Sequence, residues 1–110
     1  MSFHIKIVTP SALAYEGEAS EVIIPGSGGE YGILPSHAQI LTLNKIGLFS
    51  IFSENGDVER FVVGKGFVEF NNDKLTVLVD VFEKTDPTNN DVAQQAIQEL
   101  ENKMNPTIDA

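Results

Sequence analysis

The sequence contains no cysteine, and basic residues are scarce. Without cysteine the chain can form neither disulfides nor reactive thiolates, and this fits a reducing compartment. Seven Lys and Arg stand against sixteen Asp and Glu, which gives a net charge of -9. An acidic surface repels nucleic-acid phosphates and anionic lipid headgroups. We therefore expect no nucleic acid and no direct lipid insertion among its interactions.

Long apolar runs are also missing. No segment approaches the roughly 20 apolar residues that a membrane-spanning helix needs. Residues 3–9 alternate like a strand and do not resemble a signal peptide. Hydrophobic residues still make up 42% of the 110 residues, which is enough for a packed core. We expect one globular domain with a short appendage.

Short strand-like segments fill the chain from residue 3 to about 85. The clearest turn signal is Asn55-Gly56, because a type I′ hairpin turn requires positive φ at both central residues; the segment 71–73 is a weaker one. Many short strands at this spacing are typical of an antiparallel sandwich or barrel. The predicted strands are FHIKIVT (3–9), LAYEGEA (13–19), EVIIP (21–25), QILTL (39–43), GLFSIFS (47–53), ERFVVG (59–64), GFVEF (66–70) and KLTVLVDVF (74–82).

The character of the chain changes after residue 87. Apolar residues recur at helical spacing from Asp91 to Met104, Thr88 with Asp91 resembles a capping box, and Pro106 would end the helix. A helix of about four turns is unstable alone in water, so its apolar stripe must pack on something. The predicted fold is mainly β: an antiparallel β-sandwich over residues 1–85, then a short linker and one amphipathic α-helix over 86–110.

Two predicted strands, 47–53 and 74–82, carry apolar residues on both faces, whereas a sandwich strand usually alternates apolar with polar. In 47–53, Leu48 and Phe52 would face one way and Phe49 and Ile51 the other. In 74–82, one face would hold Leu75, Val77, Val79 and Val81, and the opposite face Leu78 and Phe82. Two explanations remain open. Either the C-terminal helix or a loop covers the outer face, or an exposed apolar patch docks a partner.

The adjacent pair Ser36-His37 raises the question of nucleophilic catalysis. Neighbours on an extended segment point to opposite sides, and no G-x-S-x-G turn is present. The glycines of 26–32 match no phosphate-binding fingerprint. The two histidines, His4 and His37, are far apart in sequence, and no metal-ligand spacing occurs. We predict no catalytic residue, no cofactor and no metal.

The segment Gly28–Thr42, GGEYGILPSHAQILT, fits protein recognition better. Its glycines and Pro35 would shape a rigid loop that holds Glu30 and Tyr31 at its tip. An aromatic ring and a carboxylate on such a projection suit a protein contact. The alternative is an ordinary hairpin loop with a solvent-facing acid.

At this segment the chain resembles the epsilon subunit of F-type ATP synthases (delta in mitochondria), whose sequence reads roughly G-E-x-G-I-L-P-x-H-A-P-L-L-T-x-L-x-x-G. The matching positions are Gly29, Glu30, Gly32, Ile33, Leu34, Pro35, His37, Ala38, Leu41, Thr42, Leu43 and Gly47. Shorter matches occur at 8–10, 15–18, 21–22, 66–69, 75–78 and Asp80. Together they cover nearly all of residues 3–85 in the family's order.

The resemblance implies a non-catalytic rotor subunit at the foot of the central stalk, which couples ion flow to ATP synthesis. It implies contacts with the ring of c subunits through Glu30, Tyr31 and Gly32. It also implies contacts with the gamma subunit through His37, Ala38 and Leu41, and an indirect link to the alpha/beta catalytic hexamer. The expected location is the cytoplasmic face of a bacterial inner membrane. The alternatives are an unrelated β-sandwich adaptor and a small hydrolase.

The chain departs from the family's pattern in two places. Gln39 replaces a common proline, which loosens the local backbone. The tail accommodates one helix where family members typically have two, so we expect a limited or absent inhibitory role. The acidic-x-x-Arg-Ala pattern with which some members bind ATP is also missing at Asp91-Val92-Ala93-Gln94-Gln95, and we expect no nucleotide site. Proton or sodium coupling would be decided in the c ring.

Overall fold

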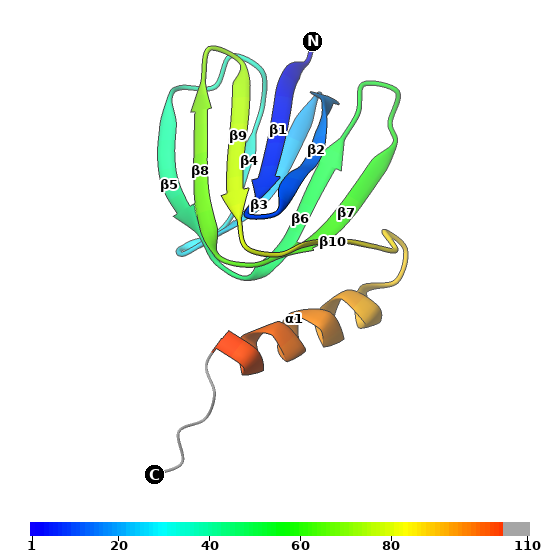
Figure 1. Ribbon diagram of the computed structural model, residues 1–110. Helices are drawn as coiled ribbons and strands as arrows, with labels where there is room; N and C mark the ends of the chain where they lie inside the picture. Colours follow the sequence, from blue (N-terminus) through cyan, green and yellow to red (C-terminus); the bar gives the residue numbers. More distant parts are fainter. Residues whose placement is uncertain (105–110) are drawn as a thin grey trace.

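The computed structural model describes residues 1–104, which form ten strands and one helix (Figure 1). The strands lie in two facing layers, and most of them run roughly vertically in Figure 1, with β10 crossing near the bottom and the helix below them. The elements are β1 (Phe3–Thr9), β2 (Ala12–Ala19), β3 (Glu21–Gly26), β4 (Gly29–Ile33), β5 (Ile40–Asn44), β6 (Gly47–Phe52), β7 (Val58–Val63), β8 (Gly66–Asn71), β9 (Lys74–Val79), β10 (Phe82–Thr85) and α1 (Asn90–Met104). The predicted mainly β sandwich with one C-terminal helix is confirmed.

The hydrogen-bonded order is β10-β7-β6-β3-β5-β8-β9-β1-β2, with β4 on β3. Only one registered pair, Gly26 with Asn44, joins β3 to β5, so the sheet folds there into two layers. One layer is β5-β8-β9-β1-β2 and the other is β4-β3-β6-β7-β10. One pairing differs from the antiparallel pattern of the others, because β1 pairs with β9 in parallel. A long connection through seven intervening strands makes this parallel pairing possible.

The core lies between the two layers and consists of apolar side chains from alternate strand positions. Across it, Tyr15 of β2 lies edge-on to Phe61 of β7 at a ring-centroid distance of 5.6 Å. The hydroxyl of Tyr15 donates a hydrogen bond to Glu59 Oε1 at 3.0 Å. Burial, together with this carboxylate, raises the pKa of Tyr15 to about 12. The largest fully buried side chains are Phe3, Phe49, Phe70, Ile5, Ile7, Ile24, Ile33 and Leu75.

The predicted strand 74–82 is in fact two strands. β9 ends at Val79, and the chain then crosses to pair β10 with β7. Leu75, Val77 and Val79 are buried as expected, but Phe82 does not lie on the outer face. Its ring stacks on Phe61 at 4.2 Å and packs against the core. The prediction for Phe82 failed because the chain moves to the other layer after Val79, where the side chain of Phe82 points towards the core.

The sequence predicts a stronger type I′ turn signal at Asn55-Gly56 than at residues 71–73, and the structure shows the reverse. Asn72 and Asp73 both have positive φ, 51° and 57°, as a type I′ turn requires. At the predicted stronger signal, only Gly56 has positive φ. Its N–H donates to Ser53 O at 3.0 Å, within a longer loop. The hairpin between β6 and β7 exists, but the predicted type I′ geometry at Asn55-Gly56 was wrong.

Helix α1 packs against β7 and β6. Ala93 is buried in this contact, and Val62, on the outer face of β7, is covered. Ala96 and Leu100 line the groove that remains between the helix and Val62. Ala93, Ala96 and Leu100 of the apolar stripe predicted from 3–4 spacing therefore face the sheet, whereas Val92 of the same stripe is 52% exposed. Pro106, the predicted stop, and the side chain of Met104 lie outside what the structure describes.

The start of α1 differs from the predicted capping box. Asn89 Oδ1 accepts hydrogen bonds from the N–H groups of Asp91 and Val92 at 3.1 and 3.4 Å, so Asn89 is the N-cap. Thr88 instead donates its N–H and its hydroxyl to Asp86 Oδ1. Both hydrogen bonds lower the pKa of Asp86, and the bond from the N–H of Thr88 is the larger cause. Nearby, Arg60 Nη1 donates to Pro87 O at 2.7 Å and fixes the linker on β7.

Candidate protein-binding surfaces

The outer face of the β5-β8-β9-β1-β2 layer carries a row of apolar side chains, one on each strand. Strand register places Leu43 beside Phe67, Phe67 beside Leu78, Leu78 beside Val8, and Val8 beside Leu13. We call these five residues the apolar row. Phe67 is 55% exposed and Leu78 48% exposed, whereas Val68, Val77 and Val79 on the opposite face are buried. Contiguous apolar surface of this kind marks an interaction site.

Two shallow grooves flank Leu78. One, of about 340 Å³, is lined by Val8, Thr9, Pro10, Leu78, Val79 and Asp80. The other, of about 250 Å³, is lined by Leu41, Phe67, Glu69, Thr76 and Leu78. Leu78 therefore forms a ridge between two apolar depressions, and each depression has one carboxylate at its rim. This relief can accept the side chains of another protein.

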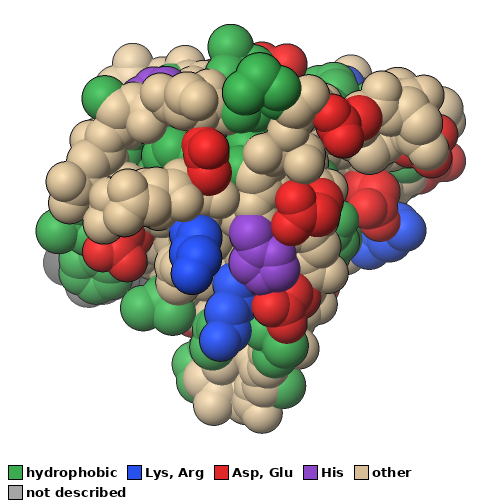
Figure 2. Space-filling view, turned by 90° about the horizontal axis from the view of Figure 1, so that it is seen from above, with side chains coloured by type: hydrophobic (Ala, Val, Ile, Leu, Met, Phe, Trp, Pro, Cys, Tyr) green, Lys and Arg blue, Asp and Glu red, His purple; other side chains and the backbone are tan. Residues whose placement is uncertain are grey.

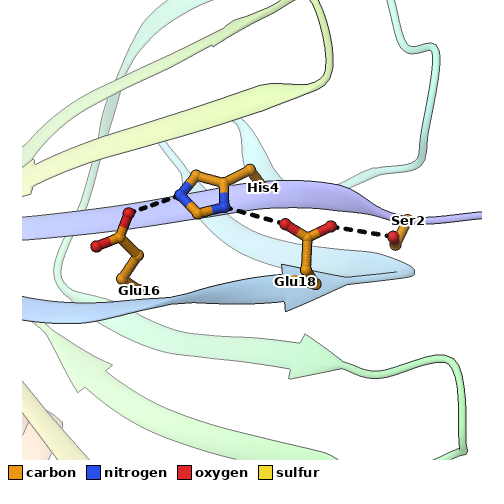
Figure 3. A network of polar contacts seen from close by, with 4 residues as sticks. All are labelled: Ser2, His4, Glu16 and Glu18. Carbon is orange, nitrogen blue, oxygen red and sulfur yellow. Dashed lines mark hydrogen bonds and ion pairs between the residues drawn. The ribbon is translucent and has the colours of Figure 1, made fainter.

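The polar half of the same face lies towards the start of β1 (Figure 3). His4 extends between two acids of β2, with Nε2 2.8 Å from Glu16 Oε2 and Nδ1 3.0 Å from Glu18 Oε2. Ser2 Oγ donates to the other oxygen of Glu18 at 3.1 Å. Hydrogen bonding to Glu18 and then to Glu16 raises the pKa of His4. Sequence reasoning treated these acids as a wet surface and missed the histidine between them.

Charges on this end of the molecule are mixed. Figure 2, seen from above, shows acidic side chains spread over the surface, with basic and histidine side chains among them and hydrophobic side chains between them. Across β1 and β2, Lys6 lies opposite Glu16 in register. In the described part of the chain, no group of three or more His, Asp and Glu side chains is arranged to hold a metal ion. We interpret the cluster as a polar border of the apolar row.

The predicted ring-contact residues Glu30, Tyr31 and Gly32 lie in strand β4 and not at a loop tip. β4 pairs with β3 over five residues, which puts the tip of the hairpin at Ser27-Gly28. Glu30 and Gly32 are exposed. The prediction that the loop holds both side chains out at its tip is corrected, because strand alternation separates Glu30 from its neighbour Tyr31.

Tyr31 points inward. Its ring packs against the core, and its hydroxyl is buried without a partner among the described residues. Burial raises the pKa of Tyr31. A Cβ added at Gly26 would lie 2.7 Å from this ring, so the turn into the hairpin requires glycine there. Of the predicted pair, only Glu30 presents its side chain to solvent.

The predicted gamma-contact residues divide between two places. His37 and Ala38 are exposed in the segment that joins β4 to β5. His37 Nδ1 lies 2.7 Å from Ala38 O, and the ring stands edge-on to Phe70. Ser36 has φ of 66°, and its N–H donates to Asp73 Oδ1 at 2.6 Å. These contacts fix the shape of the segment on the β8–β9 turn.

Leu41, the third predicted residue, is 72% exposed on the outer face of β5, where it lines one of the two grooves. It therefore belongs with the apolar row. The structure adds Phe67, Leu43 and Leu13 to the candidate surface. In the sequence, this outer face could be recognised only because apolar residues occupy both odd and even positions of the strands. β4 runs about 17 Å from the hairpin to the segment containing His37, so Glu30 and His37 lie towards opposite ends of the sandwich. Leu41 lies between them, because β5 ends at Asn44 beside Gly26 of the hairpin.

None of the described helices is both long and apolar enough to cross a bilayer. Of the residues that raised the question of catalysis, His37 makes its ring contacts with Ala38 and Phe70. No hydrogen bond joins its ring to Ser36 within residues 1–104. The exposed features that remain are surfaces suited to protein contacts.

Comparison with known proteins agrees with this description. A family model described as "ATP synthase, Delta/Epsilon chain, beta-sandwich domain" matches residues 2–85. The chain is 39% identical over 79 residues to the ATP synthase epsilon chain of Campylobacter fetus subsp. fetus, covering 72% of this chain and 61% of that relative. It is 38% identical over 105 residues to the chloroplastic epsilon chain of Guillardia theta, covering 96% and 79%.

Solved structures share the fold. A chain in the Euglena gracilis mitochondrial ATP synthase (OSCP/F1/c-ring) superposes with a TM-score of 0.77 at 14% identity, covering 99% of this chain and 68% of that one. A chain in the Tetrahymena thermophila mitochondrial ATP synthase (central stalk/c-ring) gives a TM-score of 0.62 at 12% identity, covering 92% and 94%.

Proposed function

The chain belongs to the ATP synthase delta/epsilon family, and from this premise we propose that it is a central-stalk rotor subunit that binds gamma and the c ring. In this role it has no catalysis of its own and couples ion flow to ATP synthesis, with an indirect effect on the alpha/beta hexamer. It works on the face of the energy-transducing membrane that carries the catalytic hexamer, which in a bacterium is the cytoplasmic face. The observation that carries the proposal is the family match across the sandwich, together with an exposed apolar row on that sandwich.

The two proposed contact sets are suited to two partners. Glu30 and Gly32 on β4 form the proposed c-ring contact, with Tyr31 supporting the strand from inside. His37, Ala38 and Leu41 form the proposed gamma contact, which Leu41 extends onto the apolar row. The separation of Glu30 from His37 along the strands lets one small domain touch both partners at once.

Copurification tests the proposal. Coexpressed with gamma, the chain should be recovered at a fixed stoichiometry, and replacing residues 28–42 should abolish recovery. Leu41→Asp should weaken gamma binding at least about tenfold, because it places a charge in an apolar contact. Glu30→Lys should instead weaken attachment to isolated c ring and leave gamma binding unchanged. Normal gamma binding by the Leu41→Asp chain would exclude the proposed gamma surface.

ATPase reconstitution tests the tail and the absence of catalysis. The chain alone should hydrolyse no ATP, and Ser36→Ala and His37→Ala should leave that result unchanged. Deleting residues 87–110 should change hydrolysis by the assembled ATPase only slightly. A large rise in hydrolysis on deletion would show that the tail is a strong inhibitor and would contradict the expected limited role.

A further inference from the structure

The segment that joins β4 to β5, residues 34–39, leaves the sheet in a tight turn. The His37 N–H donates to Leu34 O at 3.1 Å, so a hydrogen-bonded β-turn begins the segment. Pro35 occupies the second position of this turn, and Ser36, at the third, has φ of 66°. Proline followed by positive φ is the pattern of a type II turn, whose third position favours glycine. Ser36 therefore holds a backbone conformation that its side chain disfavours.

A side chain from another element holds this turn. The Ser36 N–H donates to Asp73 Oδ1, in the turn between β8 and β9, at 2.6 Å. Asp73 is itself fixed, because its backbone O accepts a hydrogen bond from the His4 N–H at 3.0 Å. Asn71 and Lys74 pair in register and close the turn around it. A hydrogen bond to a carboxylate is shorter and stronger than one to a neutral acceptor, so this bond can offset the backbone strain at Ser36.

The surroundings of the segment are open. A polar groove of about 300 Å³ remains between the segment and the β8–β9 turn, lined by Ser36, His37, Gln39, Asn71, Asn72 and Asp73. The imidazole of His37 stands edge-on to Phe70, with ring centroids 6.1 Å apart. Leu34 is 54% exposed, and residues 36–39 are exposed. Because the segment borders a groove and not a packed interface, a single hydrogen bond can decide its conformation.

Backbone strain is concentrated around this groove. The non-glycine residues with positive φ in the described part of the chain are Ser36, Asn72 and Asp73, and all three line the groove. Asn and Asp adopt positive φ more readily than other residues. Strain of this kind persists only where the surrounding structure holds it, and it clusters at functional sites. The residue under most strain is thus Ser36, which Asp73 holds and which directly precedes His37.

We propose that Asp73 is a positioning residue, whose carboxylate holds the turn at Ser36 and thereby presents His37 and Ala38 to the partner in one conformation. The inference rests on the proposed function, since His37 and Ala38 belong to the proposed gamma contact. Asp73 acts through the segment and not through a contact of its own. When the binding conformation of a segment is less populated in the free protein, the apparent dissociation constant rises in proportion.

Two substitutions at one position separate the carboxylate from the turn to which it belongs. Asp73→Gly keeps a residue that accepts positive φ and removes the acceptor, whereas Asp73→Asn keeps both. The reporter is the His37 amide, whose bond to Leu34 O closes the held turn. In the free chain, Asp73→Gly should speed hydrogen exchange of this amide at least about fivefold, because the held turn becomes less populated.

The conservative variant and a neighbouring residue supply the controls. Asp73→Asn should leave exchange of the His37 amide within about twofold of the unaltered chain, since its side-chain oxygen can accept the same bond. Asn72→Gly, in the same turn and also at positive φ, is the matched control and should change nothing. Exchange of the His37 amide that is unchanged in Asp73→Gly overturns the inference.

Gamma binding tests the consequence for the partner. The affinity of gamma for the Asp73→Gly chain should fall by the same factor as the population of the held turn, at least about fivefold. Asp73→Asn should restore the affinity to within about twofold. Urea unfolding of both variants should match that of the unaltered chain, which separates positioning from a general loss of stability. Equal losses of affinity in the two variants overturn the inference, because the charge and not the acceptor would then matter.

The two proposals can fail separately. If gamma binds normally to the Asp73→Gly chain although its turn has been released, the inference fails while the proposed function stands. If gamma fails to bind the unaltered chain, the proposed function fails, and with it the role of Asp73 in presenting His37 to gamma. Exchange of the His37 amide still decides in that case whether Asp73 holds the turn.

Discussion

The outer faces of the two layers have similar sequences and different surroundings. On β7, Val62 lies under α1 and is almost fully buried. On β9, Leu78 occupies an equivalent outward position and is half exposed. Of the two explanations that the sequence left open, cover by the C-terminal helix is therefore found on one layer, and the other layer keeps an exposed apolar face whose partner is a proposal. An apolar residue on an outer strand face stabilises the fold where a helix covers it and is available to a partner where none does.

The largest difference between the two faces should appear when both receive the same charge. Val62→Asp should lower the free energy of unfolding by about 3 kcal/mol, because it buries an unpaired carboxylate under α1. Leu78→Asp should change it by less than about 0.5 kcal/mol, because the new charge stays in water. Urea unfolding followed by circular dichroism measures both values. Equal losses in the two variants would mean that α1 does not protect β7.

The start of the covering helix offers a second, smaller test. Asn89→Ala should cost about 1 kcal/mol, because two N–H groups of the first turn lose their acceptor. Thr88→Ala is the control for the capping box that the sequence predicted, and it should cost less, since Thr88 bonds to Asp86 and not to the helix. Amide hydrogen exchange in α1 measures the local effect. If Thr88→Ala lowered the stability of α1 more than Asn89→Ala, the predicted capping box at Thr88 would be correct.

The smallest effect concerns the polar half of the uncovered face. Because the two glutamates raise the pKa of His4 above 6.5, the folded state holds this proton more tightly than the unfolded state. The stabilisation is therefore fully present below pH 6.5 and is lost as pH rises through the raised pKa. At this solvent-exposed site it should amount to at most about 0.5 kcal/mol.

An NMR titration of the imidazole measures the pKa of His4 directly. Glu18→Gln should lower it most and Glu16→Gln less, since hydrogen bonding to Glu18 is the larger cause. The His4→Gln chain should lose the corresponding pH dependence of unfolding. A pKa of His4 at 6.5 in the unaltered chain would show that the network of Figure 3 is not formed in solution.

The failures of sequence reasoning share a cause. Asn55-Gly56 has the better dipeptide for a type I′ turn, yet the tighter β8–β9 hairpin adopts the positive φ values at Asn72 and Asp73. The number of residues left between paired strands decided the turn type. In the same way β4 was missed, because GGEYGI has weak strand propensity and is held by its pairing with β3. Propensity ranks local options, and long-range pairing chooses among them.

The predicted contact residues show the same limit. The order of short motifs identified the family and pointed to Glu30, Gly32, His37, Ala38 and Leu41, all of which are exposed. It could not show that Tyr31 points inward, since one residue of register reverses the direction of every side chain in a strand. Nor could it bring Leu41 beside Phe67 and Leu78, because β5 and β8 are separated in the chain by β6 and β7 and are joined only by the sheet.

Local patterns in the chain were enough to establish a β-sandwich with a packed terminal helix, an acidic surface and the family. They act over a few residues, through alternation, turn chemistry and helical spacing. The layer that α1 covers, the parallel pairing of β1 with β9, the apolar row and the histidine between two glutamates came from contacts between residues distant in sequence. Those contacts depend on strand order and register, and both are set by burial of the whole core.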